Sequence, residues 1–138
     1  MSTRNEVERV VRESYAARKR NHVEDALKYF HPDARFRLVG SKSLGQMTEA
    51  ISGIAALRTM FEHLFPIWDW SKFEIHSLHV DGDKAFVHLS GQVGHIPTGK
   101  ILDTEILDTL TIKDGKIADF AEFLDTHLVA QTVGILQS

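Results

Sequence analysis

The sequence contains no cysteine, which excludes a disulfide framework, thiolate metal sites, iron–sulfur clusters and cysteine nucleophiles. It also lacks an excess of basic residues, because 16 Lys and Arg stand against 19 Asp and Glu. This balance argues against binding to nucleic acid or to an anionic membrane surface. No apolar run approaches the roughly 18 residues that a membrane helix needs. The N-terminus has no apolar signal core, so we expect a cytoplasmic protein.

The composition is that of an ordinary globular domain. With 138 residues, 43% of them hydrophobic and 25% charged, the chain fits a single domain over residues 1–138. Segment 34–39 has the pattern of a strand, and the segment 40–53 is rich in glycine and serine, which indicates a loop.

Three segments before residue 66 carry helical spacing of apolar residues. The first helix should begin near Asn5, because Thr3 and Glu6 have the spacing of a capping box. A short helix capped by Asn21 and Glu24 should follow, and a third should cover 54–65 and end at a proline.

From residue 72 on, apolar residues alternate with polar ones, which is the period of a strand. The expected strands cover residues 73–80, 85–93, 101–112 and 116–124, and Asp125 should cap a last helix. Helices followed by a meander of strands indicate an α+β fold with helices covering one face of the sheet.

Several short segments, together with this order of helices and strands, resemble a known protein family. They are Tyr15-Ala16-Ala17, FHPDARF at 30–36, DKAFV at 83–87 and KDGKI at 113–117, followed by Glu122 and Asp125. Together they resemble the SnoaL-like polyketide cyclases and ketosteroid isomerases of the nuclear transport factor 2-like superfamily. The resemblance implies a cone-shaped, curved antiparallel sheet wrapped around N-terminal helices, an apolar cavity between them, and a homodimer.

Asp108 is the strongest candidate for a catalytic residue. Its neighbours at period two are apolar except Thr104, so its side chain should point into the interior. Burial disfavours the charged carboxylate, and the pKa should rise unless a partner opposes this. The ketosteroid isomerases place a protonated aspartic acid near this position as a donor to the substrate oxygen. The alternative is a structural Asp satisfied by a neighbouring tyrosine, histidine or arginine.

Glu122 can join Asp108 in one of two hairpin registers. A three-residue loop at 113–115 would set Glu122 opposite Ile106 and Asp108 opposite Phe120, with Glu122 facing the cavity. A two-residue loop would shift the register by one and turn Glu122 outward. The resemblance favours the inward orientation, in which two neighbouring carboxyls can serve as acid and base.

Other residues complete the predicted site. Tyr15 lies at or beside the position of the family's oxyanion-donating tyrosine, although a core tyrosine is the alternative. The family's base on the first strand falls near Leu38 and is missing. A single histidine, His76, His88 or His127, could act as base or donor in the cavity, and His88 is included in the predicted site. The residues expected to line the cavity are Phe36, Leu38, Phe61, Trp68, Trp70, Ile106, Leu110, Phe120 and Leu124.

We expect no metal, because the histidines lack ligand spacing; His76 and His79, three apart on a strand, should face opposite ways. The tryptophans at 68 and 70 should lie in a loop at the cavity mouth or on a dimer surface. The predicted function is cofactor-free proton transfer on a hydrophobic carbonyl compound by an isomerase, cyclase or dehydratase. The alternative is a non-catalytic ligand-binding or dimerisation module of the same fold.

Overall fold

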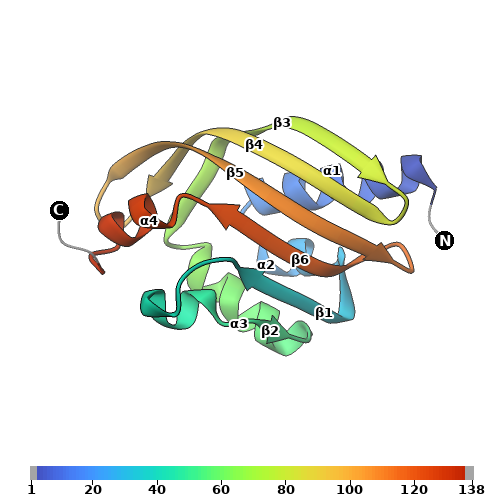
Figure 1. Cartoon of the computed structure of the whole chain (residues 1–138), viewed down its shortest axis with the longest axis horizontal. Coiled ribbons are helices and arrows are strands. Elements are labelled where there is room, and N and C mark those ends of the chain that lie inside the picture. Colours follow the sequence, from blue (N-terminus) through green and yellow to red (C-terminus); the bar gives the residue numbers. More distant parts are fainter. Residues whose placement is uncertain (1–2, 136–138) are drawn as a thin grey trace.

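The computed structural model describes residues 3–135, in which helices and strands follow the expected order (Figure 1). The helices are α1 (Arg4–Lys19), α2 (Val23–Leu27), the 3-10 helix η1 (Lys42–Thr48), α3 (Ile54–Leu64) and α4 (Thr126–Thr132). The strands are β1 (Phe30–Leu38), β2 (Ile51–Ser52), β3 (Trp68–Asp81), β4 (Lys84–His95), β5 (Lys100–Lys113) and β6 (Lys116–Leu124). Within this part of the chain, no helix is both long and apolar enough to cross a membrane.

Helix α1 begins as its capping box predicts. The Thr3 hydroxyl accepts from the Glu6 backbone N–H, and the Glu6 carboxylate accepts from the Thr3 N–H. The cap of α2 differs from the prediction. His22 is the cap residue, and its Nδ1 accepts from the Asp25 N–H at 3.3 Å. Asn21 instead adopts φ 60° in the turn between the two helices, a conformation that asparagine tolerates better than most residues.

The six strands form one sheet in the order β2-β1-β6-β5-β4-β3. Neighbouring strands are antiparallel except β1 and β6, which run parallel. The resemblance implied an antiparallel sheet, and the β1–β6 pair is the exception to it. Hairpins impose antiparallel pairing only on consecutive strands, whereas β1 and β6 are joined through α3 and the whole meander.

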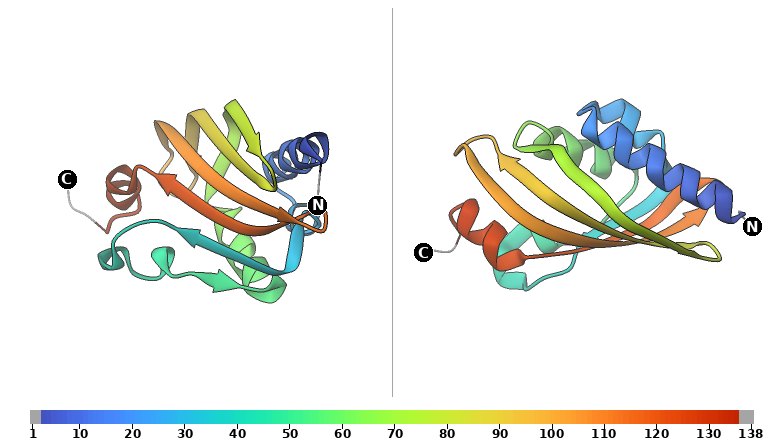
Figure 2. Two further views of the ribbon diagram at one scale, coloured as in Figure 1. Left: turned by 45° about the vertical axis from the view of Figure 1, so that its right-hand side comes forward. Right: turned by 90° about the horizontal axis from the view of Figure 1, so that it is seen from above.

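The sheet is strongly curved, and α1 lies along its inner face (Figure 2). Helix α4 lies on the other side of the sheet, at the end of β6 (Figure 2). The core fills the space between the inner face and helices α1 to α3, and its apolar residues come from all of these elements. A curved sheet around a long helix therefore encloses a space whose walls are strands on one side and α1 on the other.

Two strands, β1 and β3, begin several residues earlier than predicted. β1 starts at Phe30 and passes through Pro32, because Phe30 already pairs with Ile117 of β6. β3 starts at Trp68, which pairs with His95 at the far end of β4. The expectation that the two tryptophans lie in a loop is therefore wrong, because the length of β4 lets β3 continue along it.

Candidate functional site

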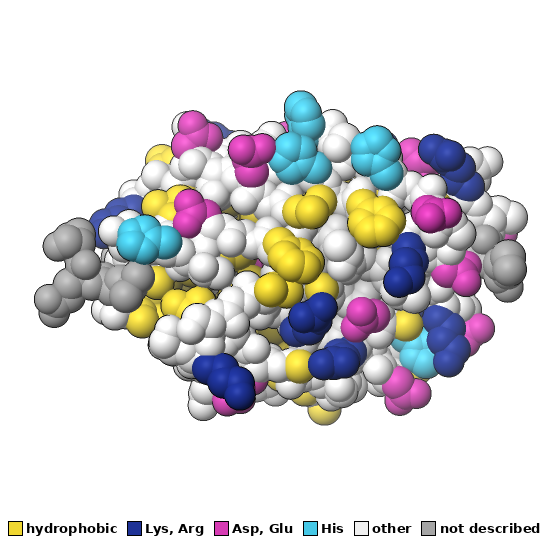
Figure 3. All heavy atoms as spheres, viewed as in Figure 1, with side chains coloured by type: hydrophobic (Ala, Val, Ile, Leu, Met, Phe, Trp, Pro, Cys, Tyr) yellow, Lys and Arg dark blue, Asp and Glu magenta, His cyan; other side chains and the backbone are white. Residues whose placement is uncertain are grey.

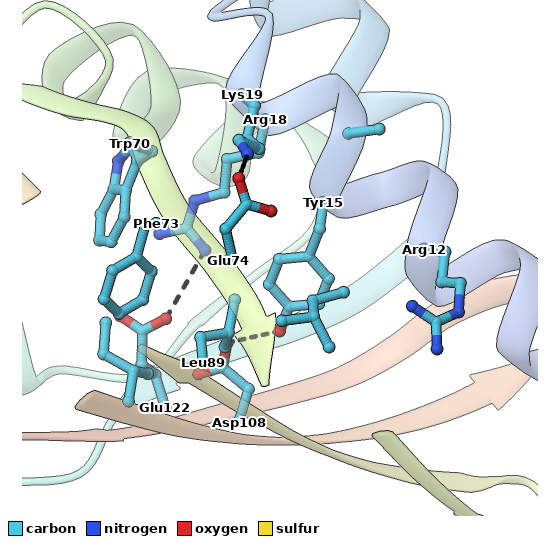
Figure 4. A pocket seen from close by; sticks show the side chains of 13 residues that line it. Arg12, Tyr15, Arg18, Lys19, Trp70, Phe73, Glu74, Leu89, Asp108 and Glu122 are labelled. Atoms are coloured by element: carbon cyan, nitrogen blue, oxygen red, sulfur yellow. Dashed lines mark hydrogen bonds and ion pairs between the residues drawn. The ribbon is translucent and has the colours of Figure 1, made fainter. Parts of the chain in front are cut away.

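A pocket of about 320 Å³ lies between α1 and the inner face of the sheet (Figure 4). Five of its residues come from α1 and the others from β3, β4, β5 and β6. They are Arg12, Tyr15, Ala16, Arg18, Lys19, Trp70, Phe73, Glu74, Ile75, Leu89, Ile106, Asp108 and Glu122. Charged and aromatic side chains thus share one hollow whose floor consists of buried strand residues.

The β5–β6 hairpin brings the two carboxyls together by a register that the sequence analysis did not consider. Its turn is the two-residue Asp114-Gly115, with φ 53° and 73°, which alone would turn Glu122 outward. A bulge between Thr111 and Ile112 then shifts the pairing by one residue. Glu122 consequently faces inward and pairs directly with Asp108 rather than with Ile106, while Phe120 pairs with Leu110.

The two carboxyls are buried side by side. Asp108 is 0% exposed and Glu122 is 4% exposed. Directly opposed residues on antiparallel strands have Cβ atoms about 5 Å apart, so their carboxyl groups are neighbours. Tyr15 reaches down from α1, and its O–H donates to Asp108 Oδ2 at 2.5 Å (Figure 4). Three predicted site residues therefore meet in one place.

Burial raises the pKa of Asp108 well above its ordinary value, and the charge of Glu122 raises it further. Arg18 and the hydrogen bond from Tyr15 act in the opposite direction without cancelling these two effects. Burial also raises the pKa of Tyr15, and the neighbouring Asp108 adds to that rise. Both effects favour the protonated form of Asp108, because a second negative charge is disfavoured in this buried site.

Arg18 is a site residue that the sequence analysis missed. Its Nη1 lies 3.6 Å from Glu122 Oε2, and its guanidinium lies 4.5 Å from the centre of the Trp70 ring. The side chain is 18% exposed, so it faces the pocket with little contact with solvent. One signal could have found it. Arg18 follows Tyr15 by three residues, and residues at that spacing share a helix face.

Three buried side-chain nitrogen or oxygen atoms within residues 3–135 have no hydrogen-bond partner, and all three belong to this pocket. They are Arg18 Nε, Asp108 Oδ1 and Glu122 Oε2. A buried polar atom without a partner costs about 1–3 kcal/mol, so such atoms are scarce in folded proteins. A proton shared between the Asp108 and Glu122 carboxyls would join two of these atoms, whereas Arg18 Nε remains a buried donor without a partner.

The pocket mouth is framed by ion pairs. Lys19 on α1 pairs with Glu74 on β3 at 2.5 Å, which ties the helix to the strand across the opening (Figure 4). Arg12, about two turns earlier, pairs with Glu8 of its own helix. Since these pairs are largely exposed, they contribute little stability and mainly set the charge around the mouth.

The residues predicted to line the cavity divide into two groups. Trp70 and Ile106 line the pocket. The remaining seven do not, and the expectation for them is corrected: they are Phe36, Leu38, Phe61, Trp68, Leu110, Phe120 and Leu124. Three of these are aromatic residues around a second void of about 20 Å³ next to the pocket. Tight aromatic packing explains this, because Phe120 stacks on Phe36 with ring centres 5.1 Å apart.

Four other members of that group have different places in the fold. Leu38 and Leu110 are buried in the sheet. Trp68 packs against His95, with ring centres 4.7 Å apart. Leu124, near the end of β6, is half-buried against the core. The apolar cavity expected from the resemblance is therefore largely filled by side chains, and the open part is more polar than predicted.

His88 does not reach the pocket. Its Nε2 lies 2.7 Å from Glu105 Oε1 on the outer face of the sheet, and its ring lies 5.0 Å from that of His76. A bulge in β3 between Ile75 and Ser77 gives His76 no partner on β4 and places it beside His88. His79 pairs with Phe86 on that same outer face, so the expectation that His76 and His79 face opposite ways is wrong.

Within residues 3–135, no group of three or more His, Asp or Glu side chains has the arrangement of a metal site. The outward histidines reflect the bulge, which changes which way a strand residue points without any signal in the hydrophobic pattern. That the protein needs no metal or other cofactor stays a prediction.

Asp108 should make stability fall as pH rises. Its folded pKa lies above the unfolded value of about 4, so between those two values the folded state binds more protons than the unfolded state. Asp108→Asn removes this group, so the free energy of unfolding of the variant minus that of wild type should grow from pH 5 to pH 8. Urea unfolding at several pH values measures it. A difference independent of pH would contradict the raised pKa.

Comparison with known proteins supports the fold. The family model of the SnoaL-like domain matches residues 11–120. A provisionally named isomerase from Bacillus subtilis has a TM-score of 0.85 at 14% identity, covering 97% of this chain and 96% of its own. TerC, co-crystallised with polyporic acid, has a TM-score of 0.81 at 17% identity, covering 94% and 98%.

A nuclear transport factor 2-like protein from Burkholderia pseudomallei has a TM-score of 0.80 at 18% identity, covering 95% of this chain and 97% of its own. At such identities these structures share the fold alone with this chain, and they confirm the predicted architecture. No curated protein matches the sequence significantly.

Proposed function

The chain belongs to the SnoaL-like domain family, and on that premise we propose that it catalyses proton transfer next to a carbonyl group of a hydrophobic small molecule. One observation carries the proposal. Two buried carboxyls, those of Asp108 and Glu122, pair directly across β5 and β6 and line the same pocket. A protonated and an ionised carboxyl side by side are an acid and a base in the same site.

The proposed step uses only the groups of this chain. The Glu122 carboxylate removes a proton from the carbon beside the carbonyl, and the electrons of the broken C–H bond form a C=C bond. The carbonyl oxygen meanwhile takes the proton of Asp108, which yields an enol. Tyr15 donates its hydrogen bond to the Asp108 carboxylate that results, and Arg18 balances the charge that Glu122 carries before it is protonated.

The enol can then follow one of three routes. Glu122 can return the proton to a different carbon, which is an isomerisation. The enol can attack a second carbonyl of the same molecule, which closes a ring. It can also expel a hydroxyl group as water. In the ring closure the proton held by Glu122 goes to the oxygen of the attacked carbonyl, and in the elimination it goes to the leaving hydroxyl group. In every route Asp108 recovers its proton from the enol oxygen, so both carboxyls return to their starting state and no oxidant, reductant or cofactor is consumed.

The base stands one strand away from the position where the resemblance expected it. Leu38, which occupies that position on β1, pairs with Glu122 on β6. Glu122 lines the pocket, so a carboxylate on this adjacent strand can take the role that the first strand lacks. This arrangement supports Glu122 as the base.

Deuterium exchange tests the proposal without knowledge of the natural substrate. Hydrophobic ketones are incubated with the protein in D₂O, and deuterium uptake at the carbon beside the carbonyl is followed by NMR. We expect catalysed exchange with at least one ketone and none with the Asp108→Asn/Glu122→Gln double variant. Equal exchange by both proteins would refute the proposal.

A non-catalytic ligand-binding module is the second candidate, and one observation favours it. The Tyr15 hydroxyl is already engaged by Asp108, so it has no second proton for a ligand. In that case the same pocket would hold a ligand without changing it. Tight binding of a ketone without deuterium exchange would identify this function.

We further propose a homodimer formed through the outer face of the sheet. Apolar side chains gather at the centre of that face (Figure 3). They include Phe86, Leu107 and Phe123, which come from three adjacent strands and are 38%, 43% and 42% exposed. Leu107 pairs with Phe123 across β5 and β6, so the apolar surface is continuous there.

Leu107→Lys should convert this dimer into a monomer. It places a charge at the centre of the apolar patch, where a second copy would have to bury it. Light scattering should give twice the 15.6 kDa of one chain for wild type and the monomer mass for the variant. Ile96→Lys is the matched control, because Ile96 is exposed in the β4–β5 loop and away from the patch. A monomeric wild type at micromolar concentration would refute the proposal.

A further inference from the structure

The geometry points to an organic anion, an aromatic or enolic acid, as the ligand class, with its acidic oxygen held by Arg18 at the Trp70 end of the pocket. This inference rests on the proposed function, because it names the substrate class of the same site. Arg18 is the key residue, because its contact with Glu122 uses few of its hydrogen-bond donors.

The guanidinium of Arg18 is under-used by its protein partners. It has five N–H donors, yet its ion-pair contact with Glu122 is 3.6 Å long, which exceeds the distance of a good hydrogen bond. Its Nε is buried and has no partner. The side chain as a whole is 18% exposed and lines the pocket, so a ligand acceptor there would meet guanidinium donors that the folded chain leaves poorly paired.

The surroundings of Arg18 select a planar acid. The guanidinium lies over the Trp70 ring at 4.5 Å, and Phe73 meets Trp70 edge-on with ring centres 5.6 Å apart. Figure 4 shows both aromatic side chains beside Arg18 on the β3 side of the pocket. Contact with the Trp70 ring holds the guanidinium group in a fixed orientation. A planar carboxylate or enolate can then accept two parallel hydrogen bonds from it.

The charge of the pocket favours an anion as well. Its lining holds three cations, namely Arg12, Arg18 and Lys19. Against them stand Glu74 and the Asp108–Glu122 pair, which carries one charge when it shares one proton. The lining itself is therefore positive by one charge, but Glu8 lies just outside it and offsets the charge of Arg12, so Arg18 is the cation that remains to attract an anion.

This placement gives the pocket two recognition points. Arg18 would hold the acidic oxygen at one end, while Asp108 and Glu122 act on a carbonyl group at the other. The apolar residues between them, Ile106 and Leu89, would contact the body of the ligand. A ketone or enol that also carries an acidic group satisfies both points at once.

Matched pairs of acid and amide test the inference on the wild-type protein. The probes are benzoate and benzamide, cinnamate and cinnamamide, and 2-naphthoate and 2-naphthamide, titrated calorimetrically at pH 7. Within each pair the shape is the same and only the charge differs. We expect at least one acid to bind about tenfold more tightly than its amide, as a charge-assisted hydrogen bond predicts.

Variants then locate the preference. Arg18→Met should abolish it, and Arg18→Lys should retain only part of it, because lysine keeps the charge but not the planar fork. Arg12→Met is the matched control. Arg12 lines the same pocket from the same helix but is exposed and paired with Glu8, so its loss should leave the preference intact.

Equal binding of acid and amide to wild type, or no binding of any acid at millimolar concentration, would overturn the inference. Equal loss of preference in the Arg12 and Arg18 variants would do so too, since the effect would then belong to the helix as a whole. These failures leave deuterium exchange on neutral ketones unaffected. Conversely, an acid preference without exchange would refute the proposed catalysis and keep Arg18 as the anion-binding residue.

Discussion

Asp108→Asn should abolish catalysed proton transfer and leave the fold intact. The asparagine amide has the shape of a protonated carboxyl, so its oxygen can still accept from Tyr15 and its NH₂ can still donate towards Glu122. What it cannot do is give up a proton to a carbonyl oxygen. General acid catalysis contributes about 10²- to 10⁴-fold to a rate, and the loss should fall in that range.

The measurement is the rate of deuterium exchange in the best ketone found for wild type, together with circular dichroism and urea unfolding to confirm the fold. Asp103→Asn is the matched control, because Asp103 lies on the same strand but is exposed. Glu122→Gln should lower the rate as strongly, since it removes the base. Exchange at the wild-type rate in a folded Asp108→Asn protein would eliminate Asp108 as the acid.

Arg18→Met should lower the free energy of unfolding by about 3 kcal/mol at pH 7. The substitution leaves the Glu122 carboxylate, which is 4% exposed, without its only nearby cation among the described residues. Breaking a buried ion pair from one side costs about 3–5 kcal/mol, and the partial exposure of Arg18 places this case at the low end.

The double variant Arg18→Met/Glu122→Gln should recover most of that loss, because it removes the unpaired charge as well as the cation. Urea unfolding of both proteins measures the recovery. Arg12→Met, which breaks only an exposed pair on α1, should stay within about 0.5 kcal/mol of wild type. A loss for Arg18→Met that the second substitution does not reduce would mean that Arg18 acts through packing against Trp70.

Local patterns in the sequence account for much of the fold. The capping box at Thr3 starts α1 where expected, and alternation along β5 correctly directs Asp108 inward. Both depend on neighbours within a few residues, which a single sequence displays. The SnoaL-like resemblance likewise rests on short segments and their order, and the match over residues 11–120 confirms it.

The site depends on features that no local pattern displays. The bulge near Thr111 decides that Glu122 faces inward opposite Asp108, and the bulge at His76 turns that residue towards His88 on the outer face. A bulge by itself changes the free energy of folding little. Its position is therefore set by how distant parts of the sheet pack together. A prediction from alternating apolar and polar residues assumes a regular strand, so it cannot locate a bulge.

Composition and periodicity alone were enough to establish an α+β chain with an inward carboxyl on β5, because hydrophobic burial imposes its period on any helix or strand. Which groups meet that carboxyl was decided only when the sheet curved around α1. Tyr15 and Asp108 are 93 positions apart in the chain, and Arg18 and Glu122 are farther apart still. Contacts of that range follow from how the strand faces and the helix pack together, and the pairing, burial and charge of the pocket follow from those contacts.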